Sequence, residues 1–490
     1  MSGGMNFDFT MRAPDGARRR DAGSPFRILV LSDFSGRGSR GVREDSAAIM
    51  SRPVRKVDVD EFYAELERVG PKVQTAAGTI DVSDIDDFHP DTLYDRLDVF
   101  AELRSKRKRL MDPSTFAEEV AALSRADDSG GEADEGGETT FDQLLGGSTG
   151  GAPAVRAGGA QVNLDAFIAN LVGKHIVPGP DPRQDQYVSS VDAAISDLMR
   201  SVLADPSFQV VERAWRSLHG LVTGVETDEN LEVAYFDITR DELFEDLKAG
   251  GPDLSMSGFV RKAIESAGGP GGQPWSLIVG DFIFEPELTD IGFLAALGGA
   301  AAGAGAAFVA GASPRFLGLD TIHGHADHTT WGKLPAEVAG PWGELKKSEL
   351  AKWIGLGFPR VLLRLPYGKK TDEVDRFEFE EVNVEAGHDS LLWGTPGFAI
   401  ATLLARSFTM RGWSMEPGDE LDLDDRPAWT VEEDGEKKLY PCAEAYISER
   451  GAEALLPEGF IPILSWKNRP AVHVVRFQSL AGTTLGGPWA

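Results

Sequence analysis

An acidic, glycine-rich stretch interrupts the globular patterns of this chain. Residues 126–140 read ADDSGGEADEGGETT, with six acidic residues and no basic one. A segment of this composition cannot bury enough apolar area to order itself. A second glycine-rich run covers 146–160. The sequence therefore predicts two globular regions, 1–125 and 161–490, joined by a flexible linker at 126–160.

Both regions alternate between strand and helix patterns. The almost unbroken apolar run FRILVL at 26–31 predicts a buried strand that leaves the core into a polar loop. Further strand patterns lie at 231–238, 275–279 (ending at Gly280 and Asp281), 308–312 and 359–365. Helical patterns lie at 90–111, 208–222, 239–247 (starting with the capping-type residues Thr239 and Glu242) and 399–408. This alternation predicts an α/β fold.

The segment 293–312 contains twenty residues without a charge, which is long enough to span a bilayer. Alanine and glycine occupy fifteen of these positions, so transfer into lipid would gain little. We expect a buried helix followed by a strand rather than a membrane span.

The chain is strongly acidic, with 49 Lys and Arg against 78 Asp and Glu, a net charge of −29. Nucleic acid and anionic membrane surfaces would repel such a chain. The lone cysteine, Cys442, cannot form an intramolecular disulfide, and the first residues contain no apolar run of signal-peptide length. We therefore expect a cytoplasmic protein that neither binds nucleic acid nor inserts into a membrane.

Catalytic and metal motifs are weak. The segment 320–328 places His323, His325 and His328 beside two aspartates, which is zinc-ligand chemistry, but nothing else in the sequence completes a site. Gly36 and Gly38 lack the lysine of a phosphate-binding loop. Acidic pairs such as Asp281 with Glu285, or Glu380 with Glu381, would serve acid-base chemistry only in a shared cleft. We expect no enzyme, no cofactor and a solvated histidine loop, with a metal-dependent enzyme as the remote alternative.

Two sets of longer segments resemble the small and large contractile-sheath subunits of bacterial type VI secretion systems, TssB (VipA) and TssC (VipB). The small-subunit resemblance lies in ILVLSDFSGR at 28–37, VDVDEF at 57–62 and DIDDFHPDTLYDRLDVFAELRSKRKRLMDP at 84–113. The large-subunit resemblance lies in FQVVERAWRSLHGLV at 208–222, DITRDELFEDL at 237–247, WSLIVGDFIFEP at 275–286, FVAGASP at 308–314, GFPRVLLRLPYG at 357–368, FEFEE at 377–381 and LLWGTPGFAIATLLARSF at 391–408.

The resemblance implies a fused sheath protein with the mixed-sheet core fold of contractile tails. In the family, the two subunits are usually separate chains, and the large one continues well beyond the motif seen here at 459–480. The resemblance thus implies a shortened large subunit. A protomer of this kind polymerises helically around an inner tube of Hcp-like rings, attaches to baseplate components and contracts to propel the tube. The alternative is a sheath-derived tubular or assembly protein that does not contract.

The resemblance also suggests two functional segments. Neighbouring sheath subunits exchange strands at sheet edges, and the alternating arm NFDFTM is our candidate for the donated strand. This arm comprises Asn6, Phe7, Asp8, Phe9, Thr10 and Met11. A frayed terminus is the competing interpretation. In the family, a ClpV-like AAA+ unfoldase recycles the sheath by gripping a short helix, and Phe141, Leu144 and Leu145 occupy the matching place.

Overall fold

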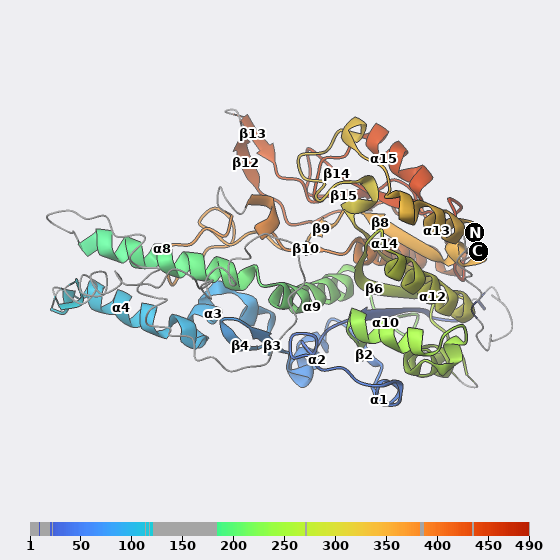
Figure 1. Ribbon diagram of the computed structural model, residues 1–490, viewed down its shortest axis with the longest axis horizontal. Coiled ribbons are helices and arrows are strands. Elements are labelled where there is room, and N and C mark those ends of the chain that lie inside the picture. Colours follow the sequence, from blue (N-terminus) through green and yellow to red (C-terminus); the bar gives the residue numbers. More distant parts are fainter. Residues whose placement is uncertain are drawn as a thin grey trace. The chain divides into compact units, whose positions relative to one another are not determined.

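A computed structural model describes residues 9, 20, 21, 23–112, 114–116, 118–120, 184–269, 272–382, 387–433 and 436–489 (Figure 1). The fold is mixed α/β, as predicted, and it contains a large mixed sheet. The chain divides into two compact units. The first comprises 1–71, 210–365 and 391–490, and the second comprises 72–209 and 366–390. Each unit therefore combines residues that precede the predicted linker with residues that follow it.

Nine strands form the sheet of the first unit, in the order β11-β15-β14-β8-β7-β6-β1-β5-β2. They are β1 (Phe26–Ser32), β2 (Arg55–Val57), β5 (Leu231–Asp237), β6 (Leu277–Phe284), β7 (Ala307–Ala312), β8 (Ile354–Phe358), β11 (Asp422–Leu423), β14 (Phe460–Ser465) and β15 (Val472–Val474). The six strands from β5 to β14 in this order run parallel, and antiparallel strands flank them on both sides.

Strand β1 lies in the parallel part of the sheet, which confirms the buried strand predicted from FRILVL. Phe26 to Ser32 pair in register with Leu231 to Asp237 of β5, and Ile28 to Leu31 pair with β6. Both faces are covered, which explains why the run is apolar without alternation. A strand from before residue 126 thus lies between two strands from after residue 160.

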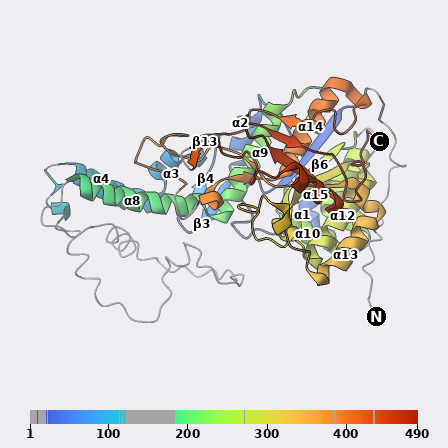
Figure 2. The ribbon, with the colours of Figure 1, turned by 90° about the horizontal axis from the view of Figure 1, so that it is seen from above.

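Helices cover both faces of this sheet. Figure 2 shows α12, α10 and α13 on one side of β6 and α14 on the other. The helices assigned wholly to the first unit are α1 (Ser46–Ser51), α2 (Phe62–Val69), α10 (Arg240–Ala249), α11 (Ser266–Gly268), α12 (Leu288–Ala304), α13 (Ala336–Lys347), α14 (Pro396–Arg411) and α15 (Glu449–Leu455). A further helix, α9 (Pro206–Gly224), begins in the second unit and continues in the first.

Two local predictions about these elements are confirmed. Thr239 and Glu242 form a reciprocal capping box at the start of α10. The uncharged segment 293–312 is the buried helix α12 followed by the strand β7, as expected. No helix in the described part of the chain is both long and apolar enough to cross a lipid bilayer.

Two strand boundaries differ from the predictions. Strand β6 does not end at Gly280 and Asp281 but continues to Phe284, with an irregular register after Val279. The pattern at 359–365 predicts one strand, whereas the main strand, β8, ends before it and only β9 (Val361–Leu362) pairs, with β10 (Trp393–Gly394). The hairpin of β12 (Thr430–Glu433) and β13 (Glu436–Leu439) completes the strands of this unit.

The second unit is mainly helical. It contains the hairpin of β3 (Lys72–Thr75) and β4 (Gly78–Asp81), with the helices α3 (Pro90–Arg96), α4 (Ala101–Met111) and α8 (Gln184–Leu203). Helices α4 and α8 lie side by side (Figure 1), and the Arg107 guanidinium of α4 donates to the Asp192 carboxylate of α8 at 2.5 Å. The backbone at Glu378 and Glu380 accepts hydrogen bonds from side chains of α8, so this part of the segment 366–382 packs beside that helix.

The prediction of a single helix over 90–111 is wrong. The chain leaves the helical conformation at Leu97, where ψ is 129°, and a short 3-10 turn leads into α4. This break leaves carbonyl groups without helical partners. The Arg104 guanidinium replaces those partners by donating to the carbonyl oxygens of Tyr94 and Leu97. A favourable side-chain contact therefore stabilises a break that neither glycine nor proline marks.

Candidate functional site

Polar side chains gather where the parallel strands of the first unit end. Ser32 ends β1 and Asp33 follows it, Asp237 ends β5, and Asp281 lies within β6. Because the carboxyl ends of parallel strands meet at one edge of a sheet, ligand sites of α/β proteins commonly form there. We therefore expect any ligand or substrate site of this sheet to lie at this edge.

Two carboxylates at this edge fix the loop that follows β1. One oxygen of Asp237 accepts hydrogen bonds from the backbone N–H groups of Phe34 and Ser35, at 2.8 and 3.0 Å. Asp33 accepts from the N–H groups of Arg37 and Gly38, at 2.9 and 2.8 Å. Both carboxylates are therefore occupied by the protein's own backbone. Their role here is to shape the loop.

The carboxyl group of Asp33 titrates abnormally. Burial, and then the neighbouring charge of Asp237, raises its pKa to about 6 from an ordinary value of 3.8. Folded protein thus holds this proton more tightly than unfolded protein does. The contribution of Asp33 to stability must therefore fall as the pH rises from about 4 to about 6.

Replacement of Asp33 tests this titration. Titration of Asp33 should lower the free energy of unfolding of the wild type by about 3 kcal/mol between pH 4 and pH 6. We expect this decrease to be absent in Asp33→Asn. Denaturant titrations at half-unit pH steps measure the slope, and Asp241→Asn, at a side chain that is 61 % exposed, is the matched control. An Asp33→Asn slope equal to that of the wild type would contradict the assignment.

An arginine-carboxylate network joins the segment after β1 to α10. The Arg52 guanidinium donates to both oxygens of Glu242, at 2.6 and 3.2 Å, and to Glu44 at 2.6 Å. The Glu242 side chain is completely buried and that of Arg52 is 8 % exposed. Arg37 approaches Glu44 and Glu242 as well. Bidentate pairing of this kind fixes geometry as well as charge, so the network fastens residues 37–52 to the later part of the chain.

Two further carboxylates of the first unit, Asp281 and Glu212, have no exposed side-chain surface. Asp281 accepts hydrogen bonds from the hydroxyl groups of Ser32 and Thr395, at 2.8 and 2.9 Å, and from the Arg213 guanidinium at 3.0 Å. Its pairing partner in the sequence analysis, Glu285, lies beyond the end of β6 and does not share these contacts. The arrangement anchors β1, β6 and α14 to one another.

Glu212 of α9 accepts from the guanidinium groups of Arg216 and Arg364, at 2.7 and 2.8 Å, and its side chain has no exposed surface. Burial alone would raise the pKa of this carboxyl, but the two arginines outweigh burial and hold the pKa below its ordinary value. Glu212 is therefore a buried, ionised and paired group rather than a proton carrier.

The histidine segment adds no metal site. His323 is exposed, and His325 and His328 are partly exposed on the loop before α13. The Asp327 carboxylate caps a short 3-10 turn instead of facing a shared centre. Within the residues that the structure describes, no group of three or more His, Cys, Asp or Glu side chains is placed to hold a metal ion.

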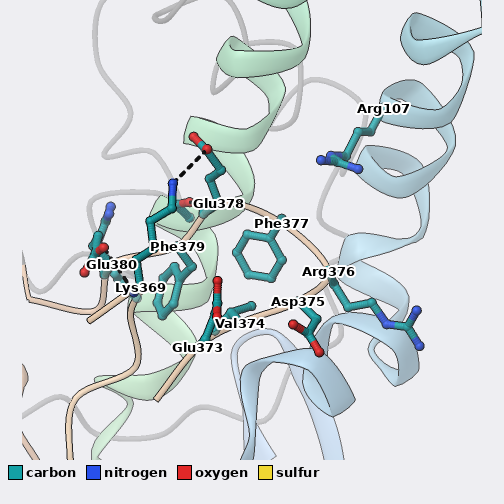
Figure 3. Close-up of a pocket in the computed structure, with 12 residues that line it drawn as sticks. Arg107, Lys369, Glu373, Val374, Asp375, Arg376, Phe377, Glu378, Phe379 and Glu380 are labelled. Carbon is teal, nitrogen blue, oxygen red and sulfur yellow. Dashed lines mark hydrogen bonds and ion pairs between the residues drawn. The ribbon is translucent and has the colours of Figure 1, made fainter. Parts of the chain in front are cut away.

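A pocket of about 560 Å³ opens in the second unit (Figure 3). Its lining contains four basic and four acidic side chains: Arg107, Arg200, Lys369 and Arg376 against Glu373, Asp375, Glu378 and Glu380. The basic groups already have partners, as in the 3.6 Å contact between Lys369 and Glu378. The segment 366–382, which supplies most of this lining, is held on α8 by two hydrogen bonds: Ser196 and Arg200 donate to the carbonyl oxygens of Glu378 and Glu380. The pocket therefore has no charge excess with which to select an ionic ligand.

The two outer strands of the large sheet form a different type of candidate site, at which a strand of another chain could pair. On one side β2 pairs only with β5, and on the other β11 pairs only with β15, among the strands in the described ranges. An open edge can accept a strand from another chain. Both edge strands are very short, which limits uncontrolled pairing.

Comparisons with known proteins show the family to which this chain belongs. Residues 185–481 match the family described as VipB: EvpB/VC_A0108, tail sheath N-terminal domain. The chain belongs to this tail-sheath family. A curated relative, the type VI secretion system sheath protein TssC1 of Pseudomonas aeruginosa, is 34 % identical over 307 residues, which cover 60 % of this chain. The match spans 61 % of the relative's own length.

The tail-sheath match excludes part of the sheet. It begins in α8 and ends after β15, so it contains β5 to β15 but neither β1 nor β2. Strand β1, which lies between β5 and β6, therefore comes from outside the matched segment, and so do Arg52 and Glu44 of the network, whereas their partner Glu242 lies inside it. The family is one of structural proteins, in agreement with an edge whose carboxylates are all engaged in internal contacts.

Most of the predicted functional residues lie outside the part of the chain that the structure describes. Of the arm, Phe9 alone is described, and its side chain packs against the core cluster that contains α12. Asn6, Phe7, Asp8, Thr10 and Met11 lie outside the described residues, as do Phe141, Leu144 and Leu145. The Arg52 and Glu242 pair was missed in the sequence, since its members are 190 positions apart and no local motif links them.

Proposed function

We propose that this protein is the protomer of a contractile, type VI secretion-like sheath. It polymerises helically around an inner tube of Hcp-like rings, in the cytoplasm, and contracts to propel that tube. The observation that supports this most strongly is the tail-sheath match over 185–481. The chain spans 61 % of the length of the curated relative.

We further propose that one chain supplies both sheath subunits. Residues 1–125 would form the small-subunit region and 161–490 the large-subunit region, with 126–160 as their linker. Support comes from β1, which lies outside the matched segment yet occupies the place between β5 and β6. A separate small subunit would have to insert the same strand to complete this sheet. The proposed fold is therefore the sheath core of contractile tails.

Assembly would use the arm and the open edges of the sheet. In this proposal, the arm of residues 6–11 donates a strand to the sheet edge of a neighbouring protomer. Copies that add with a rotation that does not close form a helical tube. The buried ion pairs would keep each protomer rigid while contacts between protomers rearrange. Contraction then releases a small free-energy difference per protomer, summed over the tube.

The remaining partners follow from the same proposal. Baseplate components would start assembly, and a ClpV-like AAA+ unfoldase would recycle the contracted sheath by binding Phe141, Leu144 and Leu145. We propose no catalytic role, because the carboxylates at the edge of the sheet are engaged in internal contacts.

Electron microscopy of the purified chain tests the proposal. We expect hollow tubes with a helical repeat, formed without nucleotide. A variant without residues 1–11 is expected to remain folded, as judged by circular dichroism and thermal unfolding, but to form no tubes. Wild-type protein that stays monomeric at high concentration and in the presence of inner-tube rings would overturn the proposed function.

A further inference from the structure

A phenylalanine of the N-terminal arm lies on the glycine-rich helix α12. A Cβ atom placed on Gly299 would lie 3.3 Å from the Cβ of Phe9 and 3.0 Å from the Cδ1 of Leu254. Phe9 is partly buried and packs against the same apolar cluster as Leu254 and Leu297. We call this place, formed by Gly299 and Leu254, the Phe9 seat.

The neighbouring glycines of α12 show that this contact is specific to one face. A Cβ on Gly298 would approach the Ile354 side chain of β8 to 2.5 Å, so Gly298 permits close packing of the helix on the sheet. A Cβ on Gly292 would meet nothing within 4 Å. At Gly299 the neighbours are Leu254 and Phe9. Glycine weakens a helix interior, and the absence of a side chain here leaves space for the aromatic ring.

We propose that the Phe9 seat holds the arm of the same chain in the free protomer and that polymerisation requires Phe9 to leave it. This inference rests on the proposed function, in which the arm is donated to a neighbour. A single half-buried aromatic contact is weak enough to be reversible. An arm held on its own protomer is not available to another sheet edge, so the contact delays spontaneous assembly until a growing end offers a better partner.

A disulfide tests whether the arm is docked in this way. The 3.3 Å distance between the two Cβ positions is close to the separation of about 3.5–4.5 Å found in disulfides. In Phe9→Cys with Gly299→Cys, we expect oxidation to link the two residues within one chain, as measured by thiol counting and by non-reducing electrophoresis. Cys442 is buried and is retained. Phe9→Cys with Gly292→Cys, on the same helix, is the matched control and should remain reduced.

The same variant tests the effect of docking on assembly. Oxidised protein is expected to form no tubes, and reduction should restore them. Gly299→Ala, whose Cβ crowds Phe9, is expected to start tube formation about tenfold faster than Gly292→Ala, which has no neighbour to displace. Light scattering measures both rates.

Three results would overturn the inference: cross-linking no better than in the Gly292 control, a ladder of covalent oligomers in place of an internal link, or oxidised protein that assembles at the wild-type rate. The ladder would mean that the seat receives a neighbour's arm. If unmodified protein forms no tubes at all, the proposed function fails. The yield of the internal cross-link still shows whether Phe9 is docked on Gly299 of its own chain, because that measurement does not depend on tube formation.

Discussion

Arg364→Met is expected to lower the free energy of unfolding by about 3 kcal/mol at pH 7. The substitution leaves the Glu212 carboxylate buried, with one arginine in place of two. The Arg364 side chain is only 7 % exposed, so neither water nor a dissolved cation can take its place beside the Glu212 carboxylate. Urea titrations followed by tryptophan fluorescence measure the change.

The pH dependence of this effect follows from the pKa of Glu212. In the wild type the lowered pKa gives stability that is present above the ordinary carboxyl pKa and is lost as the pH falls through the lowered value. Without Arg364, the carboxyl accepts a proton more readily. The penalty of Arg364→Met should therefore be largest at neutral pH and smaller near pH 4.

A double variant separates lost pairing from lost packing. Glu212→Leu combined with Arg364→Met should recover most of the stability, because a buried ion pair can be replaced by apolar groups of similar size. Lys347→Met is the surface control, since Lys347 and its partner Glu344 are 76 % and 58 % exposed, and it should cost less than about 1 kcal/mol. Equal effects of Lys347→Met and Arg364→Met would contradict this account.

Division of the chain between residues 150 and 151, within the predicted linker, is expected to reduce stability more than Arg364→Met does. We expect residues 1–150 and 151–490 to be insoluble when each is produced alone and soluble when they are produced together. Without β1, strands β5 and β6 lose the partner that lies between them and expose open edges, which favour aggregation.

Burial of β1 explains the size of this effect. Phe26, Ile28, Leu29, Val30 and Leu31 have no exposed surface. At about 2 kcal/mol for each side chain, their burial contributes about 10 kcal/mol, which is comparable to the whole stability of a typical domain. Phe26 also packs against three aromatic rings from after the linker, Phe408, Trp413 and Trp489, at centroid distances of 5.1, 5.9 and 6.2 Å.

Local sequence patterns predict the elements that depend on burial of a whole strand or on contacts between residues close in sequence. The run at 26–31 is apolar because both faces of β1 are covered, and the capping box of Thr239 depends on residues three positions apart. Strand β6 was predicted too short because Gly280 and Asp281 resemble a turn. Asp281 can lie inside a strand only because Arg213, Ser32 and Thr395 satisfy its carboxylate. Those partners are distant in sequence and could not be assigned from it.

The candidate site was harder to predict than the fold. An excess of acidic residues hides which carboxylates are buried, and Glu212 and Glu242 lie in ordinary helical patterns. The Phe9 seat depends on a contact between residues 290 positions apart, one of them a glycine within a run of small residues. The resemblance to sheath proteins, by contrast, needed only long motifs in order, and the family match over 185–481 confirms the large-subunit part of it.

The central claim is that residues on both sides of the predicted linker form one sheet. Its most direct test is to produce together the two pieces that result from dividing the chain between Gly150 and Gly151. With an affinity tag on residues 1–150 alone, size-exclusion chromatography with light scattering should show a complex of one copy of each piece that resists dilution. Pieces that are each soluble and folded alone, and that elute separately when mixed, would contradict the claim.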